Sequence, residues 1–189
     1  LKGPSGCGKS TLLLIAGGLL RPTSGDLEIA GVEPYKLALD ERAAFRASTI
    51  GFVFQQFHLV PYLDVLDNVL APSLASGRKD WKRAEALVEK FGLTPRAHHT
   101  PSALSTGERQ RAAMARALYN KPKVLLADEP TGNLDPHTSE EIMHLMEEIS
   151  ASGRTILMAT HDYALLLKFP HPTWKCAGGQ ISSTVQRTL

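Results

Sequence analysis

The order of hydrophobic and polar residues divides the chain into segments with the periods of helices. Residues 12–20 form an apolar run that suits a buried helix opening at Lys9. Residues 80–91 place apolar side chains at the spacing of an amphipathic helix, and residues 40–47 are charged and helix-prone. The Thr-Ser-Glu-Glu segment at 138–141 has the pattern of a capping box, which predicts the start of a further helix.

Short apolar runs between these segments predict strands. The three clearest are residues 50–54, 123–129 and 154–160, and each ends in polar side chains. A short strand is also expected at 26–29, and a closing hairpin is expected around Gly178. The alternation of strands with helices predicts an α/β fold with a mostly parallel sheet, whose carboxyl edge carries the chemistry.

Composition and charge restrict the classes of function. The chain has 189 residues, of which 43% are hydrophobic and 21% are charged, as expected for one α/β domain with a full core. The formal net charge is only +2 and the basic residues are scattered, so no nucleic-acid partner is predicted. The longest apolar run is far shorter than the ~20 residues that span a bilayer. A membrane function would therefore need a partner chain.

The opening segment has the pattern G-x-x-x-x-G-K-[ST], which is typical of a phosphate-binding loop. Glycines let successive backbone N–H groups surround a β-phosphate, and the following helix adds its positive dipole end. Lys9 is expected to reach the β- and γ-phosphates, Ser10 to ligate Mg²⁺, and Thr11 to lie near the α-phosphate. A glycine-rich turn with a chance lysine is the alternative. The predicted site residues are Gly3, Pro4, Ser5, Gly6, Cys7, Gly8, Lys9, Ser10 and Thr11.

Polar side chains follow each of the three main predicted strands. Asp128 and Glu129 end the second strand, where an aspartate can hold Mg²⁺ and a glutamate can accept a proton from an attacking water. Considered alone, the two carboxylates could also mark a solvated strand end. Gln55 and Gln56 close the first strand and His161 follows the third, so these side chains are expected at the same edge of the sheet.

With two further motifs, this order of residues resembles an ATP-binding-cassette ATPase over nearly the whole chain. The additional motifs are Leu104-Ser105-Thr106-Gly107-Glu108, called the signature turn below, and Asn133-Leu134-Asp135. The resemblance implies hydrolysis of ATP with Mg²⁺ by a homodimer. Each ATP would lie between the phosphate-binding loop of one subunit and the signature turn of the other. It also implies transmembrane partner subunits.

The resemblance further implies a role for each site residue. Glu129 would be the general base, His161 would hold the γ-phosphate, and Gln55, which is preferred to Gln56, would sense Mg²⁺ and water. The implied metal ligands are Ser10, Gln55 and Asp128. The residues that would contact the nucleotide of the opposite subunit, or couple the two sites, are Ser105, Thr106, Gly107, Glu108 and Asp135.

The signature turn departs from the usual Leu-Ser-Gly-Gly-Gln at Thr106 and Glu108. A carboxylate near a triphosphate needs compensation, and Arg109 and Arg111 are the candidates that the sequence offers. The sequences of this turn and of residues 131–135 are similar to those of one branch of the family. That branch includes lipoprotein-releasing, macrolide-exporting and cell-division ATPases of bacteria.

The resemblance implies a single cassette domain over residues 1–189. Residues 1–55 and 118–189 would form the P-loop core, and residues 56–117 would form a helical subdomain with the signature turn. The implied function is to power a complex for lipoprotein release or efflux at the cytoplasmic face of the bacterial inner membrane. A cell-division ATPase that regulates septal wall enzymes is the first alternative, and a soluble cassette without a transport role is the second.

Two expectations concern segments next to these motifs. Apolar residues at 57–62 would suit a groove that receives a short helix from a transmembrane partner. A phosphate-binding loop follows a strand of which Leu1 and Lys2 would be only the end, so we expect the natural N-terminus, with the aromatic that stacks on adenine, to lie upstream. Cys7 and Cys176 are expected to remain free thiols.

Overall fold

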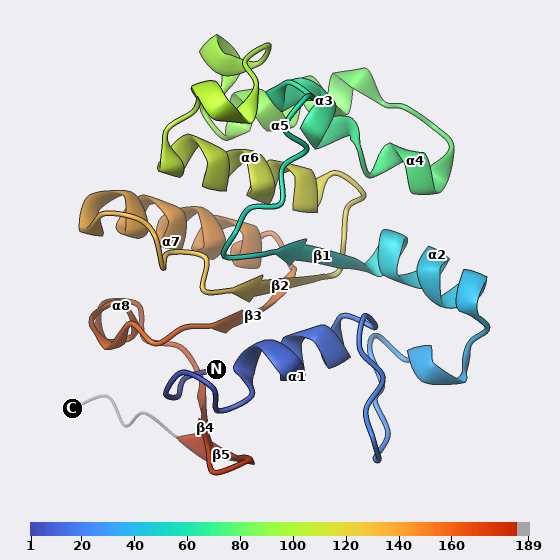
Figure 1. Ribbon diagram of the computed structural model, residues 1–189, viewed down its shortest axis with the longest axis vertical. Coiled ribbons are helices and arrows are strands. Elements are labelled where there is room, and N and C mark those ends of the chain that lie inside the picture. The colour runs from blue at the N-terminus through green and yellow to red at the C-terminus, as the bar shows by residue number, and fades with distance from the viewer. Residues whose placement is uncertain (185–189) are drawn as a thin grey trace.

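Three parallel strands form the centre of the fold in the computed structural model, which describes residues 1–184 (Figure 1). They are β1 (Ile50–Val53), β2 (Val124–Asp128) and β3 (Thr155–Ala159), paired in that order. The central strand is apolar because both of its faces are covered, and Leu125, Leu126 and Ala127 are fully or almost fully buried. The parallel α/β fold and the three main strands predicted from the sequence are confirmed.

The start of the chain continues the sheet beyond β3. Lys2 forms parallel bridges with Thr160 on one side and with Lys175 on the other. The second contact joins the antiparallel hairpin of β4 (Thr173–Ala177) and β5 (Gln180–Thr184), which was expected around Gly178. Residues 3–8 therefore leave the sheet at its carboxyl edge, beside the ends of β2 and β3.

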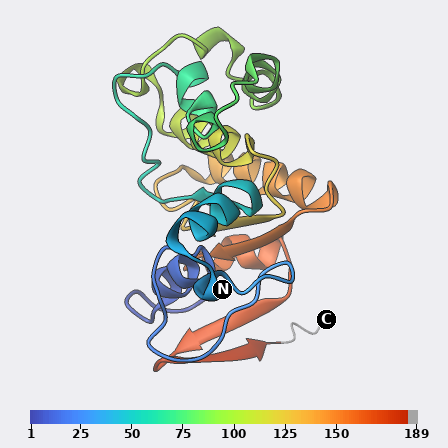
Figure 2. The same cartoon turned by 90° about the vertical axis from the view of Figure 1, so that its right-hand side faces the viewer.

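Helices cover both faces of the sheet (Figures 1 and 2). Helix α1 (Lys9–Ala16) lies against one face, where Leu13 packs in the same cluster as Leu126. Helix α7 (Pro136–Ala151) lies over the other face and buries Ile142, Met146 and Ile149. The short helix α8 (Tyr163–Lys168) follows β3, and Asp162 caps it by accepting hydrogen bonds from the backbone N–H groups of Ala164 and Leu165.

A group of helices lies beyond α7 on the far side from α1 (Figure 1). Its members are α3 (Val65–Leu70), α4 (Ser73–Ser76), α5 (Trp81–Lys90) and α6 (Thr106–Leu118). Helix α5 buries Ala84, Leu87 and Val88, which confirms the apolar face expected at 80–91. Helix α2 (Leu39–Thr49) leads into β1, and three single-turn 3-10 helices complete the described elements: η1 (Pro34–Lys36), η2 (Thr94–Arg96) and η3 (Pro101–Ala103).

Three predicted boundaries were wrong. Residues 26–29 form no strand, because only Ile29 and Val32 pair there in a single bridge. Helix α1 ends at Ala16 instead of continuing to residue 20. Helix α7 begins at Pro136 instead of Thr138, because Asp135 is the N-cap and its Oδ1 accepts from Thr138 N at 3.0 Å.

Two other expectations concern the limits of the chain and the membrane. The predicted domain boundary at residue 189 lies outside the described residues. Among residues 1–184, no helix has both the length and the apolar character that crossing a membrane requires.

A buried asparagine fixes the segment that follows β1. Asn68 is fully buried, and its amide donates to the carbonyl oxygens of Val60, Leu63 and Asp64 at 3.1, 3.0 and 2.9 Å. Its Oδ1 accepts from Val60 N at 2.7 Å. One side chain therefore satisfies four backbone groups and sets the path of residues 60–64.

We predict that Asn68→Ala destabilises the protein, because these backbone groups would lose their partners in a buried place. The free energy of unfolding should fall by about 1–3 kcal/mol, measured by urea denaturation. Glu85→Ala is the control, since Glu85 is exposed on α5 and its change should stay within about 0.5 kcal/mol. An unchanged midpoint for Asn68→Ala would contradict the anchoring role.

Candidate active site

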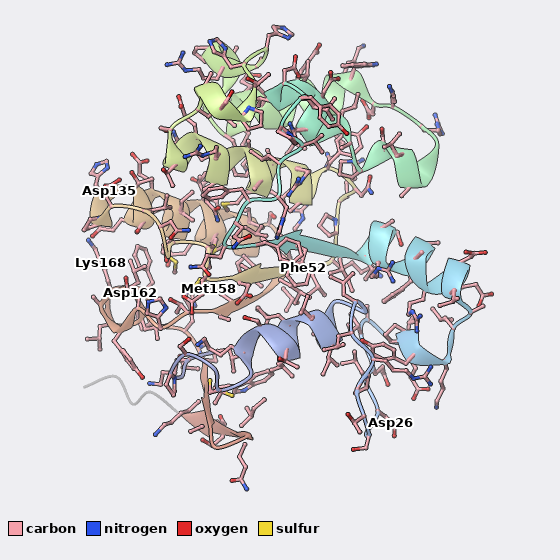
Figure 3. The ribbon with its side chains drawn as sticks, in the orientation of Figure 1. Asp26, Phe52, Asp135, Met158, Asp162 and Lys168 are labelled. Carbon is pink, nitrogen blue, oxygen red and sulfur yellow. The ribbon has the colours of Figure 1, made fainter. Side chains whose placement is uncertain are left out.

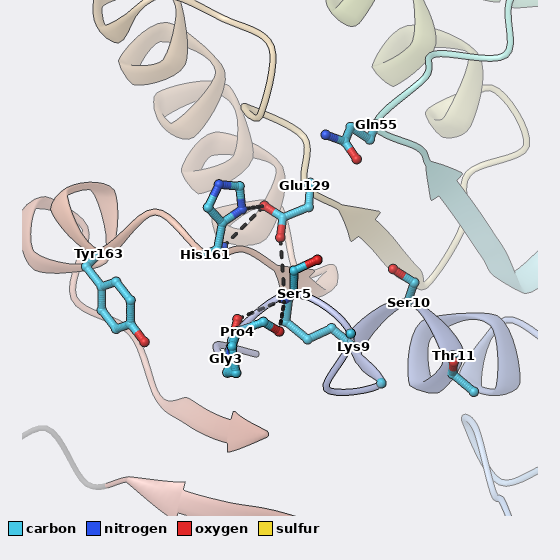
Figure 4. Close-up of a pocket in the computed structure, with 12 residues that line it drawn as sticks. Gly3, Pro4, Ser5, Lys9, Ser10, Thr11, Gln55, Glu129, His161 and Tyr163 are labelled. Atoms are coloured by element: carbon cyan, nitrogen blue, oxygen red, sulfur yellow. Dashed lines mark hydrogen bonds and ion pairs between the residues drawn. The ribbon is translucent and has the colours of Figure 1, made fainter. Parts of the chain in front are cut away.

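A cavity of about 730 Å³ opens at the carboxyl edge of the sheet (Figure 4). Residues from five parts of the chain meet in it: the loop before α1, the first turn of α1, the end of β1, the end of β2 and the segment after β3. The lining residues are Gly3, Pro4, Ser5, Gly6, Gly8, Lys9, Ser10, Thr11, Gln55, Glu129, His161 and Tyr163. Its volume falls within the range of small-molecule sites.

The loop before α1 presents backbone donors to this cavity. Gly8 occupies the N-cap position with a φ of 100°, a left-handed conformation that a side chain would strain. No side chain caps α1, so the first N–H groups of the helix are left for an external acceptor. A helix N-terminus of this kind is a natural anion site.

Lys9 supplies a fixed positive charge beside the loop. Its ammonium group donates to Gly3 O at 2.9 Å and to Pro4 O at 3.2 Å, and the side chain is only 7% exposed. The same nitrogen lies 3.7 Å from Glu129 Oε1. The ammonium is therefore held between the phosphate-binding loop and the carboxylate at the end of β2 (Figure 4).

Glu129 and His161 form a close pair across the ends of β2 and β3. Glu129 Oε2 lies 2.9 Å from His161 Nδ1 and accepts from the His161 backbone N–H at 3.2 Å. Glu129 also has a φ of 47°, which is uncommon for a residue with a side chain and is a kind of strain found at active sites. A carboxylate beside a histidine can take part in proton transfer.

Asp128 is the last residue of β2 and is not among the residues that line the cavity. Its Oδ1 is buried, and within the described part of the chain it has no hydrogen-bond partner. A buried carboxylate oxygen normally has a partner or a metal ion, and hard cations such as Mg²⁺ prefer oxygen ligands. The residues present therefore fit a divalent cation at this edge.

Gln55 faces the cavity from the other side, where the chain leaves β1 (Figure 4). Its backbone carbonyl lies 3.5 Å from Asn133 Nδ2, and a side chain at Gly132 would come within 3.1 Å of its Nε2. The glutamine thus contacts the loop that follows β2. Gln56 is not among the residues that line the cavity.

The signature turn and Asp135 do not line this cavity. Ser105 caps α6 with its side chain, and Gly107 packs so closely on α7 that a Cβ there would lie 2.7 Å from Thr138 Cγ2. Thr138 in turn donates its hydroxyl to Asp135 Oδ2 at 2.6 Å. These residues gather at the N-terminal ends of α6 and α7, and Figure 3 labels Asp135 at that end of α7.

The expected compensation of Glu108 by Arg109 or Arg111 was wrong. Arg109 donates to Thr106 Oγ1 at 3.3 Å, and Arg111 pairs with Glu141 at 3.2 Å. The cation beside Glu108 is Arg96, whose Nε lies 3.1 Å from Glu108 Oε1. The sequence could not reveal this contact because η3 and its flanking loops separate the two residues.

Two cysteines and a tyrosine complete the surroundings of the loop. Cys7 and Cys176 are free thiols, as expected, and Cys176 Sγ donates to Cys7 O at 2.7 Å from beneath the loop. Burial, followed by a side-chain hydrogen bond with Cys7, raises the pKa of the Cys176 thiol. Tyr163 lines the cavity but was not predicted; its place two residues after His161 was the available signal.

Comparison with known families identifies this arrangement. A family model described as "ABC transporter" matches residues 1–132, which is more than half of the chain. The chain belongs to the ABC transporter family. A second model, described as an AAA domain, matches residues 99–167. The resemblance inferred from the phosphate-binding loop, the signature turn and Glu129 is therefore confirmed at the level of the family.

Two relatives and one solved structure illustrate the match. The lipoprotein-releasing system ATP-binding protein LolD 1 of Rhodopirellula baltica is 50% identical over 86% of this chain and 73% of its own length. The macrolide export ATP-binding/permease protein MacB of Chromobacterium violaceum is 45% identical over 86% of this chain, which spans only 26% of that protein. A dimeric structure of the ATP-binding cassette MJ0796 bound to ADP and Pi has a TM-score of 0.88 at 38% identity, over 100% of this chain and 84% of that one.

The family assignment fixes the class of reaction. The chain is an ABC-type ATPase domain, and the α/β fold with a parallel sheet agrees with the structural neighbour. The cavity described above contains the phosphate-binding loop that this activity needs.

We predict that Lys9→Ala weakens ATP binding, because it removes the buried positive charge and keeps the backbone donors of the loop. A charge-assisted hydrogen bond is worth about 1.5–3 kcal/mol, so the Kd for ATP should rise roughly 10- to 100-fold. Isothermal titration of the full-length protein measures it. Lys36→Ala, an exposed change away from the cavity, is the control. Equal affinities for the Lys9 and Lys36 variants would refute the assignment of Lys9.

Proposed function

We propose that this chain is the ATP-hydrolysing subunit that powers a bacterial inner-membrane ABC complex of the lipoprotein-release or efflux type. The observation that carries the proposal is the meeting of Lys9, Glu129 and His161 at one cavity beside an uncapped helix N-terminus. The relatives named LolD and MacB favour this branch over the cell-division and non-transport alternatives.

In the proposed mechanism, the loop and Lys9 bind the phosphates of ATP. Ser10, Asp128 and Gln55 would hold Mg²⁺, and the buried Asp128 oxygen without a partner supports this set. When bound, Mg²⁺ neutralises charge that develops on the phosphate oxygens. His161 orients the carboxylate of Glu129 and contacts the γ-phosphate, and Glu129 accepts the proton of the attacking water.

In the proposed mechanism, the signature turn acts on the ATP that a second copy of the chain binds. Ser105, Thr106, Gly107 and Glu108 lie outside the cavity of their own chain, and we assign them to the ATP bound by a second copy. Asp135 lies next to this turn through Thr138 and would couple the two sites. The dimeric state of the MJ0796 cassette supports a homodimer here.

The proposed arrangement also defines parts within the chain. Residues 1–55 and 118–189 form the ATP-binding core, and residues 56–117 form the helical subdomain that carries the signature turn. We place the protein on the cytoplasmic face of the membrane, attached through transmembrane subunits. The LolD and MacB relatives, an ATP-binding protein of a releasing system and an ATP-binding/permease protein, support this placement.

A second cavity, of about 420 Å³, is the proposed binding site for the transmembrane partner. It lies between β1 and α6 and is mostly apolar. Its lining residues are Ala47, Ile50, Gly51, Phe52, Phe54, His58, Pro72, Ala75, Arg116, Ala117 and Asn120. Of the stretch expected at 57–62, only His58 takes part; the stacked rings of Phe52 and Phe54, with centroids 4.2 Å apart, supply most of the aromatic wall.

We predict that Phe54→Ser weakens attachment to the transmembrane partner, because it removes half of the stacked pair from this wall. Phe54 does not line the ATP cavity, so nucleotide binding should survive. Co-purification from detergent-solubilised membranes measures the attachment. Tyr62→Ser is a matched control, since Tyr62 is 81% exposed in the stretch at 57–62 but outside the groove. Loss of the partner with Tyr62→Ser but not with Phe54→Ser would refute the groove.

We predict that Glu129→Gln binds ATP but no longer hydrolyses it, because the amide keeps the size of the side chain and cannot accept the proton. Removing a general base typically lowers the rate by about 10²- to 10⁴-fold. The full-length variant should then form a dimer with Mg-ATP and separate with ADP, as measured by size-exclusion chromatography. A variant that stays monomeric at saturating ATP, or that keeps the parental rate, contradicts the mechanism.

A further inference from the structure

The two oxygens of the Glu108 carboxylate have different partners. Oε2 accepts from the Ser105 backbone N–H at 2.7 Å, while the Ser105 hydroxyl accepts from Glu108 N at 3.2 Å, and together these bonds form a capping box. Oε1 accepts from Arg96 Nε at 3.1 Å. The carboxylate thus holds the first turn of α6 on one side and is held by Arg96 on the other.

This carboxylate remains ionised at neutral pH. The backbone N–H of Ser105 lowers the pKa of Glu108, desolvation opposes that effect, and Arg96 lowers the pKa further. A negative charge at the N-terminus of α6 opposes the attraction of that terminus for an anion. A signature turn that must meet a triphosphate therefore needs a positive charge beside the Glu108 carboxylate.

Other nearby arginines are already directed elsewhere. Arg109 contacts Thr106 and lies over the ring of Phe57, 5.7 Å from its centroid. Arg111 pairs with Glu141 on α7. Arg96 comes from η2, outside the helix that carries the turn, so its position depends on the folded helical subdomain and not on α6 alone.

We propose that Arg96 is a positioning residue for the signature turn. It holds Glu108 in the capping rotamer and neutralises it, so that Ser105 and the N-terminus of α6 can meet the ATP bound by a second subunit. This inference rests on the proposed function, because the turn reaches ATP only in the dimer. The pair is partly screened, with Arg96 46% exposed and Glu108 20% exposed, so its effect is moderate.

The test uses full-length protein with Glu129→Gln as the parent and measures the ATP concentration that gives half-maximal dimer. Arg96→Gln should raise that concentration roughly 3- to 10-fold, and Arg96→Lys should restore part of the loss. Lys82→Gln, the same charge change at an exposed site on α5, is the matched control and should have no such effect.

A double-mutant cycle separates electrostatic positioning from simple packing. Glu108→Gln keeps a residue that fits the capping box but removes the charge. In that background Arg96→Gln should change the half-maximal concentration less than about 2-fold. An equal loss in both backgrounds would overturn the proposal, and so would an Arg96→Gln variant that dimerises like the parent.

The same experiment distinguishes the two levels of inference. A Glu129→Gln parent that never dimerises would overturn the proposed ATP-driven dimer, and the role of Arg96 with it. A parent that dimerises, combined with no dependence on Arg96, would overturn only the role of Arg96. Thermal unfolding of each variant provides the folding check, and raising the salt concentration should reduce the difference between Arg96→Gln and its parent.

Discussion

The parallel pairing of β2 with β3 determines which side chains can meet in the active site. Asp128 is in register with Ala159, and Glu129 N donates to Ala159 O at 2.9 Å. Thr160 N donates in turn to Leu1 O at 3.0 Å, which fixes the start of the phosphate-binding loop beside the same strand. A slip of one residue would move His161 by about 3.3 Å along the strand and turn alternate side chains to the opposite face. The contacts of the Glu129 side chain with His161 and Lys9 therefore depend on backbone hydrogen bonds that involve none of these three side chains.

The charges at this edge are not balanced by the protein alone. Asp128 and Glu129 are adjacent carboxylates. Among the described residues, Lys9 and His161 are the basic residues that form ion pairs with Glu129. Lys9 also donates hydrogen bonds to two loop carbonyls, which hold its ammonium group beside the loop. The unpaired oxygen of Asp128 and the uncapped N-terminus of α1 are thus complementary: one favours a cation and the other an anion, as Mg²⁺ and a phosphate would require.

The sequence predicted those parts whose determinants are local. The buried strands and the apolar face of α5 follow from patterns within a few residues. The strand expected at 26–29 failed because alternation alone does not supply a pairing partner, and only Ile29 finds one in Val32. The compensation of Glu108 failed for a related reason. Arg109 and Arg111 are near in sequence, but α6 directs them to Thr106 and Glu141, whereas Arg96 arrives from a separate turn.

Helix α6 joins the two regions that the proposed function assigns to different partners. Its N-terminus carries the signature turn, and near its C-terminal end Arg116 donates to the backbone carbonyls of Phe57 and His58. Both of those residues have positive φ, so Arg116 holds the chain after Gln55 in a conformation that it would otherwise seldom adopt. The helix has 13 residues and a length of about 20 Å, and it is covered on more than one side, because the consecutive residues Ala112, Ala113 and Met114 are all buried. Since a packed helix moves as a rigid body, a displacement at the groove beside His58 would tilt the signature turn at the other end. The geometry thus provides a direct physical connection between the seat proposed for a transmembrane partner and the residues proposed to close on ATP.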